Sequence, residues 1–232
     1  MSATVFLIPS VLDEAATHTI PLYVMKAVLQ CQVIFAENER TARRFLKSLN
    51  KNIVIDNYEW YAIHKAEEMQ KQAFQQKIKE GKNIAIISEA GCPGIADPGQ
   101  VLVALAQDMQ ATVKPLVGPS SILLALMASG MNGQRFEFLG YLPVDAAERI
   151  KAIKEIEQAS QQKNSTQIFI ETPYRNDQLV EAILKACKPA TKLCIAAELT
   201  GANEQVQTKT VAQWRQQKIS LHKKPVIFLL QA

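Results

Sequence analysis

The segment from Ser88 to Gly99 constrains the fold of this chain most strongly, because it joins two different hydrophobic patterns. It follows the short apolar run Ile84–Ile87 and precedes apolar residues at helical spacing, which are Val101, Leu102, Leu105 and Met109. The segment reads SEAGCPGIADPG, which is too rich in glycine and proline for a regular element. A buried strand, an irregular loop and a helix are therefore predicted in succession. In open α/β sheets, ligands bind outside the carboxyl ends of strands, where this loop would lie.

The loop lacks the usual motifs of phosphate-binding sites. Neither G-x-G-x-x-G nor G-x-x-x-x-G-K-S/T occurs in it, and no lysine or arginine lies between Asn83 and Val113. The loop offers Glu89, Asp97 and exposed backbone instead, which suits a ligand without phosphate, including a cationic one. Buried sheet and helix segments also lack basic residues, so that simpler explanation of the gap stays open.

Length and composition are typical of a globular protein. The 232 residues allow one large α/β domain or two of about a hundred residues each. Hydrophobic residues make up 48% of the chain and charged residues 21%, which is enough for a substantial core. No apolar run reaches the roughly 18 to 20 residues that cross a membrane, and the N-terminus does not resemble a signal peptide. No membrane contact is expected.

The cysteines and the net charge narrow the function classes further. The four cysteines form no C-x-x-C pair and the three histidines are scattered, so no metal site is expected. Free thiols in a reducing cytoplasm are the simple interpretation. The formal net charge of +4 permits a nucleic-acid partner but does not argue for one.

Short apolar runs alternate with helical patterns in the first half of the chain. The expected strands are Thr4–Ile8, Val33–Ala36, Ile53–Ile55, Ile84–Ser88 and Thr112–Leu116, and the expected helices are Ile20–Gln30, Glu39–Leu49, Lys65–Glu80 and Gly99–Met109. This order predicts an α/β fold with a mostly parallel sheet covered by helices. Asn38 and Asp97-Pro98 are expected to begin helices, and Gly81 and Gly130 to end them.

The second half repeats this style without repeating the sequence. The expected strands are Phe136–Tyr141, Gln167–Glu171, Leu193–Ala197 and Pro225–Leu230, with an edge strand at Val206–Thr210, and the expected helices are Ile122–Ala128, Asp145–Gln162 and Asn176–Cys187. The best boundary lies between Gly118 and Gln134. Two α/β domains with mostly parallel sheets are therefore predicted, at residues 1–117 and 118–232.

Five motifs occur in order along the chain. They are Ser88–Gly99, Pro115–Ser121 (PLVGPSS), Arg135–Pro143 (RFEFLGYLP), Ile170–Arg175 (IETPYR) and Ala196–Thr200 (AAELT). Together they resemble the motifs of the tetrapyrrole methylase superfamily, and within it those of the ribosomal RNA small subunit methyltransferase I family. The loop of that family reads S-D-A-G-T-P-x-x-S-D-P-G, and this chain has Glu89, Cys92 and Ala96 in place of its Asp, Thr and second Ser.

The resemblance implies S-adenosylmethionine in a cleft between two α/β domains, and a homodimer. This cofactor carries a sulfonium cation and no phosphate, so a loop poor in lysine and rich in glycine and proline suits it. The helix after Ser120-Ser121 would offer free N–H groups to an acceptor on the cofactor, and ordinary capping is compatible with that role. The cofactor contacts carried over are Pro9, Gly91, Cys92, Pro93, Ile95, Ala96, Asp97, Gly118, Ser120, Ser121, Glu171, Thr172, Leu199 and Pro225.

Two segments depart from the family pattern. The family's P-T-P-I-G-N-L-x-D becomes Ile8–Glu14, where only Pro9 matches well, and its A-E-D-T-R becomes Ala36–Arg40, which loses the Asp. In the family, both segments lie toward the substrate side of the cleft. Cofactor binding is therefore better supported than the family's reaction, the 2′-O-methylation of a cytidine in small-subunit rRNA.

Glu37 and Glu89 are the candidate general bases, because each follows an apolar strand and should lie at its carboxyl end. A weak nucleophile such as a ribose hydroxyl gains from a base, although alignment supplies much of the acceleration of methyl transfer. Either carboxylate could instead cap a helix or pair with an arginine. Glu171 and Glu198 could form structural ion pairs with Arg175 or Arg135. Cys92 has no neighbouring histidine and is expected to shape the loop.

The densest basic cluster is Arg40, Arg43 and Arg44, followed by Lys47 and Lys51. On a helix over Glu39–Leu49, the three arginines and Lys47 share one face, which could bind RNA phosphates or simply be solvated. The aromatic residues Tyr58, Trp60 and Tyr61 could stack on bases, or form core and dimer contacts.

Three functional hypotheses follow. The first is an S-adenosylmethionine-dependent methyltransferase that acts on RNA. The second keeps the chemistry but has a small molecule such as a tetrapyrrole as substrate. The third is a paralogue that binds cofactor or RNA without catalysis, because the N-terminal motif has diverged.

Overall fold

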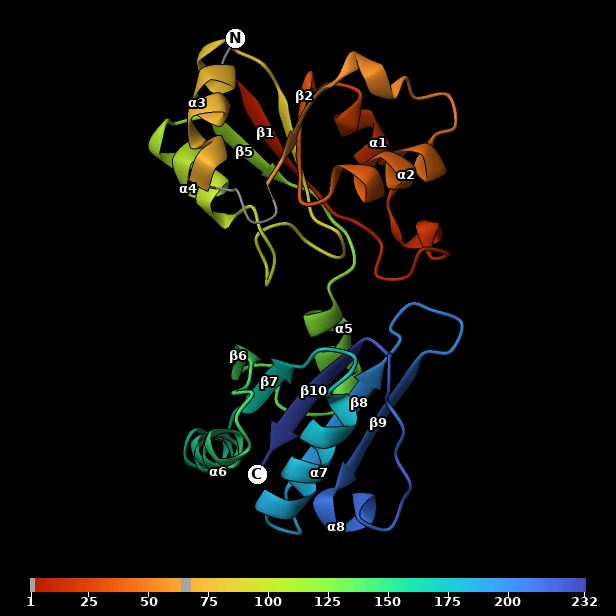
Figure 1. The fold of residues 1–232 in the computed structure, drawn as a ribbon, viewed down its shortest axis with the longest axis vertical. Helices are drawn as coiled ribbons and strands as arrows, with labels where there is room; N and C mark the ends of the chain where they lie inside the picture. Colours follow the sequence, from red (N-terminus) through yellow and green to blue (C-terminus); the bar gives the residue numbers. More distant parts are fainter. Residues whose placement is uncertain (1–2, 64–67) are drawn as a thin grey trace. The chain divides into compact units, whose positions relative to one another are not determined.

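The structure is a computed structural model that describes residues 3–63 and 68–232. It divides into two compact units, Met1–Ser120 and Ser121–Ala232, and within the described residues each unit holds one five-stranded sheet (Figure 1). The domain bounds 1–117 and 118–232 stay a prediction. None of the described helices is both long enough and apolar enough to cross a bilayer.

The sheet of the first unit is parallel throughout. Its strands are β1 (Thr4–Ile8), β2 (Val33–Ala36), β3 (Glu59–Ala62), β4 (Ile84–Ile87) and β5 (Thr112–Pro115), in the order β3-β2-β4-β1-β5. Its helices are α1 (Leu22–Val28), α2 (Glu39–Leu49), α3 (Lys71–Lys79) and α4 (Gln100–Asp108), with single 3₁₀ turns at Thr17–Thr19, Ile55–Asn57 and Glu68–Gln70. The predicted α/β class is confirmed for this unit.

Helices cover both faces of this sheet, which explains why its central strands β2 and β4 are apolar at every position. Alternate residues such as Phe6, Ile34 and Ile87 pack with Val24 and Leu46 of α1 and α2. The residues between them, including Val5, Phe35 and Ile86, pack with Phe74 and Leu102 of α3 and α4. Figure 1 shows the two helix pairs on opposite sides of the strands.

Two expectations for this unit are wrong. The run Ile53–Ile55 is not a strand: Ile53 and Ile55 are buried, but Ile55 begins a 3₁₀ turn and the strand lies at Glu59–Ala62. This strand is at the sheet edge and only half-buried, so its hydrophobic signal is weak. The helix expected from Lys65 begins at Lys71, and residues 65–67 of that prediction lie outside the described residues.

The predicted helix caps are partly correct. Asn38 Oδ1 accepts the Arg40 and Thr41 N–H groups over 3.0 and 3.4 Å, which confirms it as the N-cap of α2. Gly81 follows α3 with φ of 71°, and Gly130 follows α5 (Ser121–Ser129) with φ of 68°, as helix-ending glycines do. Asp97-Pro98 does not begin α4. Pro98 O accepts the Gly94 N–H within the loop, and Gly99 takes the cap position.

The sheet of the second unit is mixed, which corrects the expectation of a mostly parallel sheet there. Its strands are β6 (Phe136–Tyr141), β7 (Thr166–Ile170), β8 (Lys192–Ala197), β9 (Gln205–Thr210) and β10 (Val226–Gln231), in the order β6-β7-β10-β8-β9. Only β6 and β7 pair in parallel. The loop from β8 to β9 is too short for a parallel crossover, and β10 returns between β7 and β8. The predicted edge position of β9 is confirmed.

Four helices accompany this mixed sheet. They are α5 (Ser121–Ser129), α6 (Ala146–Lys163), α7 (Asn176–Ala186) and α8 (Val211–Trp214). Ile153 of α6, Leu179 of α7 and Trp214 of α8 share a core with Phe169 and Phe228 of the strands. Helix α5 contacts β8, β9 and β10.

Candidate functional site

The Ser88–Gly99 loop lies at the carboxyl end of β4 and is tied to the segment that follows β1. Ser10 and Gly91 form a two-way backbone bridge, with the Ser10 N–H donating over 2.8 Å and the Gly91 N–H over 3.2 Å. The Ser10 hydroxyl also donates to Ser88 O over 2.7 Å. Gly91 has φ of +73°, a conformation that favours glycine. The diverged N-terminal segment therefore still holds the loop.

A third segment joins the same place. A Cβ atom on Gly118 would lie 2.1 Å from Pro9 Cβ, so the backbones approach too closely for any side chain there. The Cys92 thiol lies 3.6 Å from Pro119 O. The structure thus brings together four predicted cofactor contacts, which are Pro9, Gly91, Cys92 and Gly118.

Three carboxylates gather beside this loop. Glu37 follows β2 and Glu89 follows β4, and Glu37 Oε2 accepts the Glu89 N–H over 2.9 Å. The Thr41 hydroxyl donates to Glu89 Oε1 over 3.1 Å. Burial, followed by the negative charges of Glu37 and Glu89, raises the pKa of Asp97 to about 6. The group creates a negative potential that would stabilise a cation and could hold a proton.

The remaining loop residues shape this environment. Pro93 is buried and Ile95 is exposed. The backbone turns at Ala96, which has a left-handed φ of 63°. Burial, and then the charge of Asp97, raise the pKa of the Cys92 thiol, which opposes thiolate formation and agrees with a loop-shaping role. Across the described ranges, no group of three or more His, Cys, Asp and Glu side chains is arranged to hold a metal ion.

A pocket of ≈ 180 Å³ opens beside Glu89. Ser10, Glu14, Thr41 and Arg44 supply polar groups to its lining. The pocket is therefore lined by the diverged N-terminal segment, by α2 and by a candidate general base.

The three arginines of the basic cluster differ in their contacts. Arg43 is half-buried, pairs with Glu39 over 2.5 Å and lies 4.8 Å from the centre of the Trp60 ring, which favours a structural role. Arg44 lines the pocket and lies 3.4 Å from Glu14. Arg40 is exposed and forms no ion pair within the part of the chain that the structure describes. Arg40 and Arg44 are thus exposed, whereas Arg43 is held against Trp60.

The predicted aromatic group packs into the first unit. Tyr61 stacks on Phe35 with ring centres 4.7 Å apart, and Tyr58 and Trp60 pack against the core beneath α1 and α2. Of the two roles considered for these aromatic residues, base stacking and core packing, the contacts are those of core packing.

In the second unit, four further predicted contacts lie at one edge of the sheet. Pairing of β10 with β7 and β8 places the ends of those strands, Glu171-Thr172 and Leu199, near Pro225. The Glu198 N–H donates to Pro225 O over 3.0 Å. Ser121 is the first residue of α5, whose first N–H groups have no partner within the helix.

Glu171 is buried at this edge and is held by its neighbours. Burial alone would raise its pKa, but Arg175 and the Thr172 N–H, which donate to Oε1 over 2.7 and 2.6 Å, hold the pKa below its usual value. The predicted Glu171–Arg175 pair is confirmed. Glu198 lies 2.7 Å from Lys224 instead of the expected arginines. Among the described residues, Glu171 Oε2 and Thr200 Oγ1 are buried without a hydrogen-bond partner, as a polar ligand's partners would be.

Comparison with known proteins decides the family. Residues 16–214 match the model of the Tetrapyrrole (Corrin/Porphyrin) Methylases family. This chain belongs to the tetrapyrrole methylase family. Its curated relatives include two proteins named ribosomal RNA small subunit methyltransferase I. The one from Escherichia coli O157:H7 is 31% identical over 90% of this chain and 69% of its own length. The one from Vibrio cholerae is 34% identical over 66% of this chain and 52% of its own length. This methylase chain therefore spans about half to two thirds of the length of these relatives.

Solved structures agree with the methylase fold. A diphthine synthase matches with a TM-score of 0.67 at 13% identity, over 100% of this chain and 90% of its own. A uroporphyrin-III-C-methyltransferase from Thermus thermophilus matches with a TM-score of 0.58 at 16% identity, over 100% and 93% of the two chains. At these identities the likeness concerns the fold alone.

Sequence reasoning missed several polar residues, two beside the Ser88–Gly99 loop of the first unit and one in the second unit. Ser10, Thr41 and Thr200 were not predicted, and Asp97 was expected as a cofactor contact but not as a titrating group. The N-cap Asn38 offered a signal for Thr41, since a side chain three residues after the cap lies on the same side of the helix as the cap. The other residues depend on loop packing that no local pattern reveals.

Proposed function

We propose that this chain is an S-adenosylmethionine-dependent methyltransferase that methylates RNA, at a ribose 2′-oxygen of small-subunit rRNA by family resemblance. The observation that carries the proposal is that Glu37, Glu89 and Asp97 form an acidic group at the Ser88–Gly99 loop, which contains no lysine or arginine. When bound, S-adenosylmethionine supplies a methyl group on a positively charged sulfur. The residues present fit such a group, because carboxylates stabilise a cation and the loop offers no competing positive charge.

The chain's own residues divide the work as follows. The close approach of Gly118 to Pro9 and the left-handed backbone of Gly91 set the shape of the loop. Glu37 fixes the backbone of Glu89, and Glu89 faces the 180 Å³ pocket, where it could accept a proton from a substrate hydroxyl. The cofactor contacts proposed are Pro9, Gly91, Cys92, Pro93, Ile95, Ala96, Asp97, Gly118 and Ser120 in the first unit, and Ser121, Glu171, Thr172, Leu199 and Pro225 in the second.

RNA is favoured over a small-molecule substrate by the size of the pocket beside Glu89. Its ≈ 180 Å³ is below the roughly 300 to 1,000 Å³ of usual small-molecule sites, so it suits one group presented by a larger substrate. Arg44 in the pocket and the exposed Arg40 supply charge for RNA phosphates. The resemblance adds a homodimer that works in the cytoplasm, and both belong to this proposal.

The test is transfer of labelled methyl from S-adenosylmethionine to purified small-subunit rRNA by the wild type, Glu89→Gln and Glu155→Gln. Glu155 is exposed on α6 and serves as the matched control. If Glu89 is the general base, Glu89→Gln should lower the rate of methyl transfer about 10²-fold, and Glu155→Gln should leave it unchanged. Binding of S-adenosylhomocysteine without transfer to any RNA would favour the non-catalytic paralogue.

A further inference from the structure

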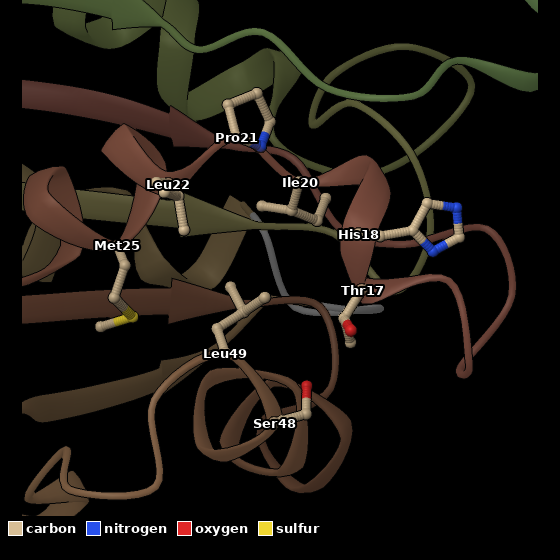
Figure 2. Close-up of a pocket in the computed structure, with 8 residues that line it drawn as sticks. All are labelled: Thr17, His18, Ile20, Pro21, Leu22, Met25, Ser48 and Leu49. Atoms are coloured by element: carbon tan, nitrogen blue, oxygen red, sulfur yellow. The ribbon is translucent and has the colours of Figure 1, made fainter.

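The first unit has a second pocket, which shares the lining residue Ser48 with the pocket beside Glu89. Its volume is ≈ 440 Å³, and Figure 2 shows the residues that line it. The apolar side chains of Leu22, Met25 and Leu49 gather at one end, the His18 ring stands at the other, and the Thr17 and Ser48 side chains lie between them. No acidic residue lines it among the described residues. Leu22 is 90% exposed at its lip, an unusual position for a large apolar side chain.

The two pockets are consecutive along α2. Thr41, Arg44 and Ser48 of α2 line the pocket beside Glu89, and Ser48 also lines the second pocket. Residues at this spacing share one helix face. The path from Thr41 to Ser48 covers about 10 Å of helix at 1.5 Å per residue. A substrate strand that enters beside Glu89 would thus reach the second pocket along this face.

Basic side chains stand along the same helix. Arg44 lines the first pocket, and its contact with the exposed Glu14 is a surface pair of the kind worth little, so a phosphate could replace it. Lys47 is exposed and donates only to the Lys51 carbonyl among the described residues. Positive charge along α2 is complementary to the backbone of a nucleic-acid strand.

The geometry points to a nucleobase subsite formed by His18, Leu22, Met25 and Leu49, which receives an unstacked base of the RNA strand next to the methylated nucleotide. Apolar walls and an imidazole ring suit the two faces of a base, and the Thr17 and Ser48 hydroxyls can bind its edge. The 10 Å path exceeds the 3.4 Å spacing of stacked nucleotides, so the strand must be single-stranded and splayed here. This inference rests on the proposed RNA substrate.

The test measures binding of a fluorescein-labelled single-stranded RNA of about 12 nucleotides by fluorescence anisotropy. The variants are Leu22→Glu and His18→Ala in the pocket, Leu29→Glu as the matched control and His18→Phe as the conservative ring replacement. Leu29 is also exposed and follows the same helix outside the pocket, so both Glu variants add one charge at the surface. The RNA is also used with one abasic residue at each position in turn.

The subsite predicts about tenfold weaker RNA binding for Leu22→Glu and His18→Ala, with His18→Phe and Leu29→Glu close to wild type. One abasic position should weaken binding to the wild type but add nothing in Leu22→Glu. Equal binding by Leu22→Glu and Leu29→Glu, with rRNA methylation intact, would overturn the subsite alone. Wild type that binds S-adenosylhomocysteine in calorimetry but no RNA would overturn both the subsite and the proposed RNA substrate.

Discussion

The backbone N–H of Glu89 donates to the Glu37 carboxylate over 2.9 Å, although the two residues are 52 positions apart in the sequence. Strands β2 and β4 are neighbours in the parallel sheet, so their carboxyl ends meet at one edge. Because of this contact, a change at either candidate general base alters the charge and the hydrogen bonding around the other.

Glu37→Gln should therefore separate charge from geometry. Glutamine keeps an oxygen that can accept the Glu89 N–H, but it removes one negative charge from the acidic group. We expect about tenfold weaker binding of S-adenosylmethionine and little change for S-adenosylhomocysteine, which lacks the sulfonium charge. Calorimetry with both ligands, beside the control Glu155→Gln, measures the difference. Equal losses for the two ligands would show that the charge of Glu37 is not directed at sulfur.

Asp97 should make stability depend on pH. Its pKa is about 6 in the folded chain against 3.8 as the ordinary value, so the folded state holds the proton more tightly. The free energy of unfolding therefore falls as the pH rises from about 4 to about 6, and the full cost remains above that range. Asp97→Asn should stabilise the protein by about 1 kcal/mol at pH 7.5, after allowance for solvent screening, and by nothing near pH 4. Urea unfolding at both pH values checks this, and a constant difference would contradict it.

Gly118→Ala should destabilise the first unit. The new Cβ would lie 2.1 Å from Pro9 Cβ and 2.4 Å from its Cγ, so the backbone must shift at a cost of about 1 to 3 kcal/mol. Gly133→Ala is the control, because nothing lies within 4 Å of its added Cβ. In urea unfolding, Pro9→Gly should recover part of the loss in the double variant. Additive effects of the two substitutions would mean that the clash is relieved in another way.

Removal of Arg175 should expose the cost of the buried Glu171 carboxylate. The Glu171 side chain is 0% exposed and Arg175 32% exposed, so Arg175→Met leaves a buried charge without its cation. About 2 to 3 kcal/mol of stability should be lost near pH 7, and less at low pH where Glu171 is protonated. Arg135→Met, at an exposed position, is the matched control. A pH-independent loss would point to lost packing instead.

Most strands and helices could be predicted from the sequence in both units, but the direction of strand pairing was predicted correctly for the first unit and not for the second. Buried central strands such as Val33–Ala36 read as apolar runs, and α2 has both a capping Asn38 and clear periodicity, so their bounds were predicted correctly. The half-buried edge strand Glu59–Ala62 lacks such a signal. The antiparallel return of β10 between β7 and β8 depends on pairing between distant segments, which local patterns do not encode.

The candidate site shows the same division. The motif residues Gly91 and Gly118 could be found because glycine is required where backbones crowd or turn. The raised pKa of Asp97 could not, because it arises from burial and from charges on other segments. The sequence could not separate Arg43 from Arg44 either, because both belong to the same basic run. The packing of Arg43 against Trp60 appears only in the folded structure.

The Thr41 hydroxyl lies 3.1 Å from Glu89 Oε1 and 3.0 Å from the Asn38 carbonyl, and it carries a single hydrogen. It can donate to only one of these oxygens at a time. Rotation about the Cβ–Oγ1 bond of Thr41 therefore switches Glu89 Oε1 between two states. In one it accepts the hydrogen of Thr41, and in the other it is free of that hydrogen and can accept one from a substrate. The Thr41 hydroxyl, in the first turn of α2, thus takes the place of a substrate hydroxyl at Glu89. A substrate can replace it without movement of the backbone.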